Sequence, residues 1–297
     1  MYKTILIDGD IIAHKACFAC EERWYHLSII DIDDRNSRTT VPEVFKYKRQ
    51  AVDRQRILRL KGIDTKITKH KDCMPAFVAF KLVDTLITRL KYELPAEDYL
   101  ICSGHPEGSG QFRYDIATQA PYKGNRCEED RPIHIDDVKA YMHNKYNSIY
   151  AEEVEADDYL GILQSTSEGT VIASIDKDLL QIPGEHYNID SQEHITSDDP
   201  GKLWLTARKS GKRDLRGYGF KWFCAQMLLG DAVDNIKKPK NGVGPVKIFD
   251  LLNEVDDPTK MWKIVDNIYN ESIINIEENA DLLWILRGPG NNWRNLV

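Results

Sequence analysis

The sequence predicts an α/β fold, with a mainly parallel sheet flanked by helices and a helical C-terminal subdomain after it. Up to about residue 200, short apolar runs rich in β-branched residues alternate with stretches of helical spacing. Beyond that point the pattern changes to helices rich in Trp, Phe and Leu, joined by basic loops. The 297 residues, 42% of them hydrophobic, suffice to bury a core. We therefore expect a first domain over residues 1–200 and a helical subdomain over residues 201–297.

The first element is expected at residues 4–7, an apolar run with two isoleucines that stops at Asp8-Gly9-Asp10. Such a run, bounded by a turn, is typical of a buried strand. Helical spacing follows over residues 11–22. Residues 24–72 show no pattern that predicts an element.

The alternation continues through the middle of the chain. The expected elements are a helix at 76–93, a strand at 99–102, a helix from 136, a strand at 149–150, a helix at 156–164 and a strand at 170–175. Strands separated by helices imply crossover connections, and functional residues in parallel sheets collect beyond the carboxyl ends of the strands. Asp8 and Asp176 both follow expected strands, so we expect them at such ends.

Charge is distributed unevenly along the chain. The net charge of -7 argues against a nucleic-acid partner, which usually needs a basic surface. Residues 44–72, however, contain ten Lys or Arg against three Asp, and residues 202–247 contain eleven against three. Each stretch is either a solvated surface or a phosphate-binding one.

Cysteine usage and hydropathy indicate the cellular compartment. Cys17 and Cys20 form a CxxC pair, but no second pair or nearby His pair completes a zinc site, so buried reduced thiols are the expectation. No apolar run is long enough to span a bilayer, and the first residues lack the stretch typical of a signal peptide. We expect a cytoplasmic protein with no membrane partner.

Four short acidic motifs point to the chemistry. They are Asp8-Gly9-Asp10, Glu155-Ala156-Asp157-Asp158, Asp176-Lys177-Asp178 and Asp231-Ala232-Val233-Asp234. Helix capping explains the second motif equally well when it is taken alone, and turn chemistry explains the third and fourth. If the motifs converge, their like charges need a compensating cation. Oxygen ligands without His or Cys suit Mg²⁺ or Mn²⁺, and two such ions are a standard device for attack on a phosphodiester.

A glycine-rich segment follows the last acidic motif. Asn241-Gly242-Val243-Gly244-Pro245-Val246-Lys247 precedes an amphipathic run. Glycines allow close backbone approach, and free amides at a helix start suit a phosphate. A plain turn between two helices is the alternative. The nearby Lys237, Lys238 and Lys240 favour contact with a nucleic-acid backbone.

These motifs in this order, together with Tyr122-Lys123-Gly124-Asn125-Arg126, resemble the flap endonuclease and 5′-to-3′ exonuclease family. The similarity extends to phage replication exonucleases and to the 5′ nuclease domain of bacterial DNA polymerase I. It runs from residue 8 to about residue 252. The resemblance implies a PIN-like nuclease domain with a helix-hairpin-helix subdomain. The implied activity is hydrolysis of DNA with 5′ ends, flaps or nicks in replication and repair, with RNA primers in RNA/DNA hybrids as further substrates and a monomeric enzyme.

The resemblance also implies roles for individual residues. Two Mg²⁺ or Mn²⁺ ions would be held, the first by Asp8, Glu155, Asp157 and Asp158, the second by Asp176, Asp178, Asp231 and Asp234. Lys123 and Arg126 match the basic pair that grips the scissile phosphate, and together with Asp8 and Asp158 they form the expected catalytic set. Tyr122 would stack on a terminal base or pack internally. Lys240, Gly242, Gly244 and Lys247 would bind duplex backbone, with a K⁺ ion among the carbonyls.

One departure from the family pattern concerns the end of the second predicted strand. The family places a metal-linked aspartate there, whereas Cys102-Ser103-Gly104-His105-Pro106-Glu107 has none. His105 or Glu107 would have to substitute, and Asp10 is an additional acid without an assigned part. Residues 44–72 and 105–131 are the candidates for an arch over the 5′ strand.

Two rival functions remain open. A haloacid-dehalogenase-like phosphatase also begins with a strand ending in Asp-x-Asp and uses the first Asp as nucleophile. That hypothesis leaves the Glu155 motif, the Lys123/Arg126 pair and the glycine-rich segment unexplained. A non-catalytic protein that binds DNA structures would keep the fold without the chemistry.

Overall fold

The structure is a computed structural model that describes residues 1–30, 41–105, 111–127, 130–208, 211–240 and 242–297. Within these residues the centre is a six-stranded sheet in the order β6-β5-β1-β7-β8-β9. The strands are β1 (Tyr2–Asp8), β5 (Ala96–Gly104), β6 (Ile149–Ala151), β7 (Thr170–Ser174), β8 (Gly184–Asn188) and β9 (His194–Ser197). All neighbours run parallel except β8 and β9. The predicted α/β fold with a mainly parallel sheet is confirmed.

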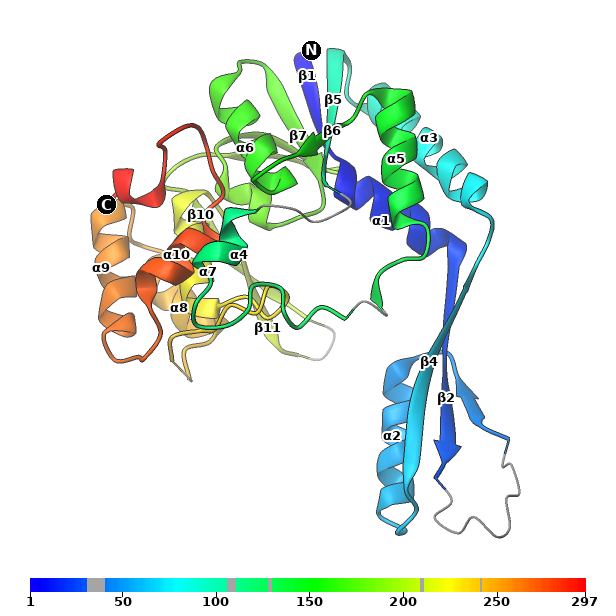
Figure 1. The fold of residues 1–297 in the computed structure, drawn as a ribbon. Helices are drawn as coiled ribbons and strands as arrows, with labels where there is room; N and C mark the ends of the chain where they lie inside the picture. The colour runs from blue at the N-terminus through cyan, green and yellow to red at the C-terminus, as the bar shows by residue number, and fades with distance from the viewer. Residues whose placement is uncertain (31–40, 106–110, 128–129, 209–210, 241) are drawn as a thin grey trace.

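Helices cover both faces of the sheet (Figure 1). One face packs against α1 (Gly9–Cys20), α3 (Ala76–Glu93) and α5 (Ile135–Tyr146), and the other against α6 (Ala156–Thr166). The central strand β1 explains this arrangement, because Ile5 and Ile7 face the first group whereas Leu6 faces α6. All three side chains are buried, as the continuous apolar run predicts.

The C-terminal part contains helices and one β-hairpin. The elements described there are β10 (Lys202–Ala207), β11 (Arg213–Tyr218), α7 (Gly219–Leu229), α8 (Pro245–Leu252), α9 (Pro258–Tyr269), α10 (Ile276–Leu283) and the short helix η3 (Trp293–Asn295). Aromatic side chains fill its core, with Phe223 packed edge-on against Trp284. The expectation of helices alone is wrong for residues 202–218, which form the antiparallel strands β10 and β11. Leu203, Leu205 and Leu215 from these strands pack on the C-terminal core.

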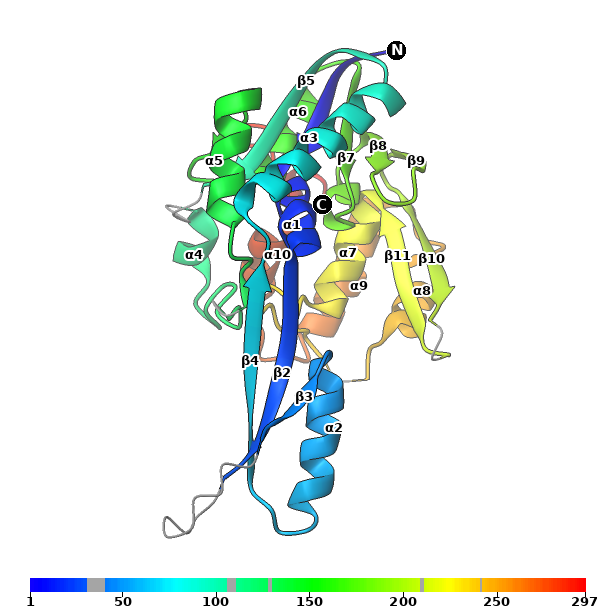
Figure 2. The same cartoon turned by 90° about the vertical axis from the view of Figure 1, so that its right-hand side faces the viewer.

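Residues 21–30 and 41–73 form an arm that projects from the body, as Figures 1 and 2 show. Its elements are β2 (Glu21–Ile29), β3 (Glu43–Phe45), α2 (Lys48–Arg59) and β4 (Thr65–Cys73). The strands are antiparallel in the order β3-β2-β4, and α2 packs on them through Ala51 and Leu58. The sequence predicts no element over residues 24–72, although it indicates residues 44–72 as a candidate arch over the 5′ strand, a role that stays a prediction.

Two short helices lie near the sheet's carboxyl edge. They are α4 (Phe112–Ile116) and the 3₁₀ helix η2 (Asp178–Gln181). Within the ranges described, no helix combines the length and the apolar character that crossing a membrane requires.

Candidate metal centre and phosphate site

Asp8 lies at the carboxyl end of β1, where it also begins α1. Its Oδ1 accepts a hydrogen bond from the Ile11 amide at 3.1 Å, and its Oδ2 accepts one from Ser174 Oγ at 2.6 Å. The side chain is buried, and burial together with the nearby Asp10 and Asp176 raises its pKa to about 7. Because β1 and β7 are parallel neighbours, the acids that follow them meet at one edge of the sheet.

Asp176 and Asp178 follow β7 at this edge. The Asp178 amide donates to Asp176 Oδ1 at 2.8 Å, and Gln226 Nε2 donates to Asp178 Oδ1 at 2.5 Å. Burial, and then repulsion from Asp176, raises the pKa of Asp178 to about 7. Burial also raises the pKa of Asp176, with Asp234 and Asp231 adding to it. The third and fourth acidic motifs therefore lie near one another.

The fourth motif is a tight turn after α7, as the alternative explanation by turn chemistry predicts. Asp231 Oδ1 accepts the amides of Val233 and Asp234 at 2.6 and 3.3 Å. The Asp231 amide also donates to the Ile236 carbonyl at 3.0 Å, which closes the turn. The turn directs the Asp231 and Asp234 charges toward Asp176 and Asp178, so the structural and the chemical explanations hold together.

The second motif splits into residues with different surroundings. Glu155 is the N-cap of α6, and its amide donates to Asp158 Oδ2 at 3.1 Å in a capping box. Asp157 lies near Asp8 and Asp176, and we call these three residues together with Asp178 the acid cluster. Burial and the charges of Asp176 and Asp8 raise the pKa of Asp157 well above its ordinary value. Within this one helix turn, Glu155 and Asp158 therefore cap α6, whereas Asp157 lies with the other acids.

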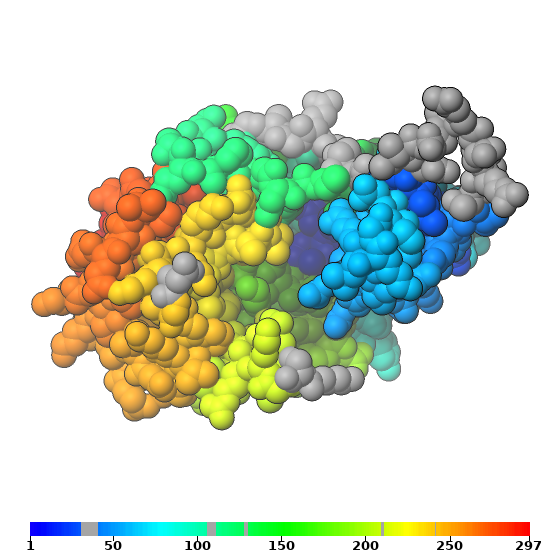
Figure 3. Space-filling view, turned by 90° about the horizontal axis from the view of Figure 1, so that it is seen from below, coloured from blue at the N-terminus to red at the C-terminus, as the bar shows by residue number. Residues whose placement is uncertain are grey.

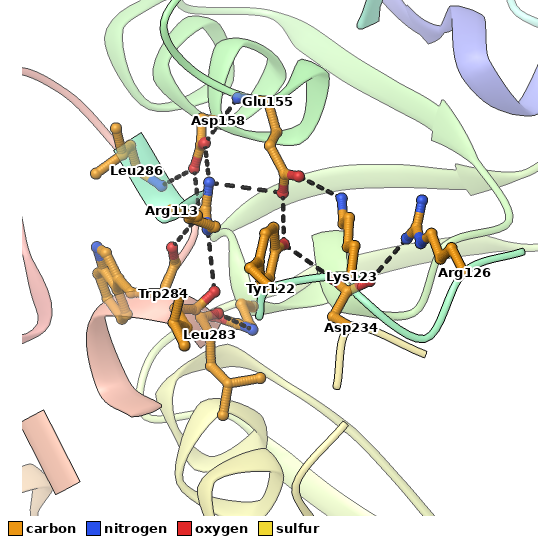
Figure 4. A network of polar contacts seen from close by, with 12 residues as sticks. Arg113, Tyr122, Lys123, Arg126, Glu155, Asp158, Asp234, Leu283, Trp284 and Leu286 are labelled. Carbon is orange, nitrogen blue, oxygen red and sulfur yellow. Dashed lines mark hydrogen bonds and ion pairs between the residues drawn. The ribbon is translucent and has the colours of Figure 1, made fainter. Parts of the chain in front are cut away.

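Asp158 corrects the prediction. It is fully buried and forms a two-pronged ion pair with Arg113, whose Nη2 lies 2.8 Å from Oδ1 (Figure 4). The Leu286 amide donates to the same Oδ1 at 3.0 Å. With both oxygens engaged inside the protein, Asp158 has no free lone-pair direction toward the acid cluster, and we withdraw it as a metal ligand and as a catalytic residue.

Arg113 is a buried cation that no sequence motif indicated. Its guanidinium also donates to the carbonyls of Leu282 at 3.0 Å and Trp284 at 2.6 Å. Its pKa is raised by Asp158, which outweighs the effect of burial. The Arg113–Asp158 pair therefore joins α4, α6 and the segment after α10.

Tyr122, Lys123 and Arg126 all approach the acids, as Figure 4 shows. The Tyr122 hydroxyl lies 3.1 Å from Glu155 Oε2 and 3.0 Å from Asp234 Oδ2. Lys123 forms an ion pair with Glu155, and Arg126 Nη2 lies 2.7 Å from Asp234 Oδ1. The two cations thus compensate two of the predicted acids.

Tyr122 itself is not available to stack on a base. Only 4% of it is exposed, because it belongs to the C-terminal core, and its ring also packs edge-on against Tyr114. Burial, and then Glu155 and Asp234, raises its pKa. Of the two roles predicted, internal packing is correct, and the DNA-binding assignment is withdrawn.

Asp10 occupies the end of β5, where the expected aspartate is missing. Its Oδ2 accepts the Gly104 amide at 3.1 Å, and Lys139 Nζ lies 2.7 Å from its Oδ1. A Cβ at Gly104 would lie 3.2 Å from Asp10 Oδ2, so glycine leaves room for this carboxylate. His105 instead packs against the Tyr150 ring, and Glu107 lies outside the described residues.

The glycine-rich segment leads directly into α8. Gly244 is the N-cap of α8 and Gly242 has a φ of 86°, which favours glycine. A Cβ at either glycine would meet nothing within 4 Å, so the backbone is open to a ligand. Lys240 forms an ion pair with Glu271, and Lys240 followed by Lys247 lowers the pKa of that carboxyl. Asn241 lies outside the described residues.

The donor set fits a hard divalent cation, although the side chains do not close around one. Among the residues that the structure describes, no group of three or more His, Cys, Asp or Glu is placed to hold a metal ion. The carboxylates at the sheet edge raise one another's pKa. Lys123 and Arg126 form ion pairs with the neighbouring Glu155 and Asp234. Buried like charges of this kind are relieved by a divalent ion with oxygen ligands.

Comparison with known proteins gives a likeness at the level of the fold. No family model matches the chain. Among solved structures, the T5 D15 protein co-crystallised with metal ions is similar, with a TM-score of 0.50 and 12% sequence identity. The match covers 96% of this chain and 89% of that one. At this identity the likeness shows a shared fold.

Proposed function

We propose that the protein is a metal-dependent nuclease that hydrolyses phosphodiester bonds at the 5′ ends, flaps or nicks of DNA, and of RNA primers in hybrids. The observation that carries the proposal is the convergence of acids from four separate segments at the carboxyl edge of the sheet. The similar T5 D15 protein was co-crystallised with metal ions, which agrees with a metal-dependent site.

In this proposal two Mg²⁺ or Mn²⁺ ions are held by carboxylates. Asp8, Glu155 and Asp157 would serve the first, with Asp10 supplying the carboxylate at the end of β5, and Asp176, Asp178, Asp231 and Asp234 would serve the second. When bound, the ions supply an activated water and neutralise the charge that develops on the phosphate. Hydrolysis forms one bond from the water oxygen to phosphorus and breaks one ester P–O bond.

Lys123 and Arg126 would bind the scissile phosphate once metal replaces them at Glu155 and Asp234. Lys123 and Arg126 already contact Glu155 and Asp234. A short movement of the two side chains would therefore bring them to a phosphate bound beside these carboxylates. A point charge and a planar fork together stabilise a more negative transition state.

The remaining features concern the substrate and the setting of the enzyme. Lys240, Gly242, Gly244 and Lys247 would bind duplex backbone, with K⁺ among the carbonyls. We place the nuclease domain in residues 1–200, the helix-hairpin-helix subdomain in 201–297, and the protein, as a monomer, in the cytoplasm.

The rival phosphatase function has less support from the geometry. It needs Asp8 as a free nucleophile, yet both Asp8 oxygens accept hydrogen bonds and burial favours their protonation. A nucleophilic carboxylate must be ionised and exposed to the substrate.

The test is a cleavage assay on 5′-labelled blunt, nicked, flapped and RNA-primed duplexes, with and without Mg²⁺. We expect Mg²⁺-dependent products, and we expect Asp176→Asn to lose about a thousandfold or more in rate, as the loss of several kcal/mol of charge stabilisation implies. The matched control is Asp198→Asn, an exposed aspartate outside the cluster, which should cleave like the wild type. Duplex binding without cleavage in Mg²⁺ would support the non-catalytic alternative, and a trapped phosphoenzyme on Asp8 would support the phosphatase.

A further inference from the structure

The arm, residues 21–30 and 41–73, is held to the body at its base. Lys69 forms an ion pair with Asp130, Lys71 Nζ donates to the Arg131 carbonyl at 2.8 Å, and the Ile133 amide donates to Glu21 Oε2 at 2.9 Å. Residues 130–133 follow shortly after Lys123 and Arg126 in the chain. The arm is therefore anchored next to the segment that carries the proposed phosphate-binding pair.

Helix α2 presents most of its surface to solvent. Of its twelve residues, only Ala51 and Leu58 are buried, and they face the strands of the arm. At 3.6 residues per turn, Lys48, Arg49, Arg56 and Arg59 fall within a sector of about 100° along about 17 Å of helix. All four side chains are exposed. We call this sector the cationic face of α2.

Few of these charges are compensated. Neither Arg56 nor Arg59 has an ion-pair partner among the described residues, and the Arg49–Asp53 pair is long, at 3.8 Å, and solvated. Arg54, on another side of the helix, is bound to Glu43 at 2.9 Å. The cationic face thus keeps a net positive charge, with Arg56 and Arg59 unpaired among the described residues, in a chain whose net charge is -7.

Helix stability does not account for this pattern. Arg56 and Arg59 lie in the last turn, where cations favour the helix dipole. Lys48 and Arg49, however, lie in the first turn, where cations are unfavourable, and that turn contains no acid. An anionic partner accounts for all four positions, because phosphates would stabilise cations along the whole helix.

We infer that the cationic face of α2 binds the sugar-phosphate backbone of a DNA duplex. This inference rests on the proposed function, which it extends to a second contact away from the acids. A straight helix with cations along its length suits the regular phosphate rows of a duplex. Single strands are usually bound on aromatic side chains, and the cationic face contains none.

The position of the arm agrees with this assignment. Seen from below, the arm and the segment after α7 stand on opposite sides of a hollow in the surface (Figure 3). In Figure 1, α2 lies on the side of the arm nearer the body's C-terminal part. A duplex held at the glycine-rich segment on one side would meet α2 on the other.

The test is fluorescence anisotropy with a labelled blunt duplex across a salt series, in EDTA so that no cleavage occurs. Arg56→Gln/Arg59→Gln should lower the slope of log K against log salt by about 2 and weaken binding by about tenfold or more. The matched control is Lys260→Gln/Lys263→Gln, an exposed pair with the same spacing on α9, which should bind like the wild type. Arg56→Lys/Arg59→Lys keeps the charges and should keep the slope.

An unchanged salt slope in the glutamine variant overturns the inference, as does a loss confined to single-stranded probes. A wild type that binds no duplex overturns it too. If the wild type cleaves DNA in Mg²⁺ but its duplex binding does not depend on Arg56 and Arg59, the proposed nuclease function is kept and the role of α2 is rejected. If duplex binding depends on α2 but no substrate is cleaved, the role of α2 in DNA binding is kept and the proposed nuclease function is rejected.

Discussion

Individual carboxylates in one motif have opposite energetic roles. Asp157 is surrounded by like charges, which raise its pKa, whereas Asp158 is held by Arg113 and two backbone amides. Removing one partner of a buried ion pair leaves an uncompensated charge, but removing one of several like charges relieves repulsion. Adjacent residues should therefore respond differently to the same substitution.

Asp158→Asn should lower the free energy of unfolding by about 3–5 kcal/mol, because it strands the buried Arg113 guanidinium. Arg113→Met should cost a similar amount, and the double variant should lose less than the sum of the two. Denaturant unfolding measures all three. The control is Asp157→Asn, which should not destabilise the metal-free protein. Equal stability of Asp157→Asn and Asp158→Asn would contradict a structural role for the ion pair.

Elements bring the site together through close backbone packing at the carboxyl ends of strands. Gly9 lies between Asp8 and Asp10 where α1 passes the end of β5. A Cβ on Gly9 would lie 2.7 Å from the Cys102 carbonyl oxygen and 3.0 Å from Ile101 Cγ2. The glycine therefore sets how near the first acidic motif comes to β5.

Gly9→Ala should force α1 away from β5 and cost about 1–3 kcal/mol of stability, as overpacking does. The same shift would displace Asp8 and Asp10, so Mg²⁺-dependent cleavage should fall further than stability alone explains. Thermal unfolding and the cleavage assay measure the two effects. Gly244→Ala is the control for stability, because its Cβ would meet nothing within 4 Å. A Gly9→Ala protein as stable and active as the wild type would show that α1 tolerates the shift.

Across the whole molecule, negative charge gathers at the sheet edge and positive charge on the arm. The acid cluster costs stability when it is ionised, because burial and repulsion raise the pKa of Asp8 and Asp178 from 3.8 to about 7. A carboxyl whose pKa is raised by folding favours the protonated form. Its stabilising contribution is complete below pH 3.8 and is lost as the pH rises through about 7.

In EDTA, we expect Asp178→Asn to raise the melting temperature at pH 8, with the gain shrinking toward pH 4. Mg²⁺ should stabilise the wild type more at pH 8 than at pH 5, because the cluster binds the ion when ionised. Differential scanning fluorimetry over this pH range measures both effects, with the exposed Asp198→Asn as control. A stabilisation by Asp178→Asn that is the same at every pH would contradict charge repulsion as its cause.

Much of the fold and part of the candidate site could be predicted because they depend on local pattern. Alternating apolar runs and helical stretches specify a parallel sheet, and the sheet then brings the residues after β1 and β7 to one edge. Asp8 and Asp176 are predicted in this way, whereas Asp157 and Asp178 come from the acidic motifs and the family resemblance. The structure places all four near one another, and their metal-binding role stays a prediction.

What only the tertiary structure decided are the contacts between distant residues. Asp158 turns inward because Arg113, 45 residues away in the chain, meets it in the core, and Tyr122 is buried by helices that follow it by a hundred residues or so. Asp10 reaches the end of β5 because Gly104 leaves space there. The elements of the arm could not be predicted from the sequence pattern, because they depend on the packing of α2 against its strands. The periodicity of a sequence indicates which face of a helix or strand is apolar. The hydrogen-bond partner of a buried polar group depends instead on which elements pack together in the fold, and local periodicity does not specify that packing.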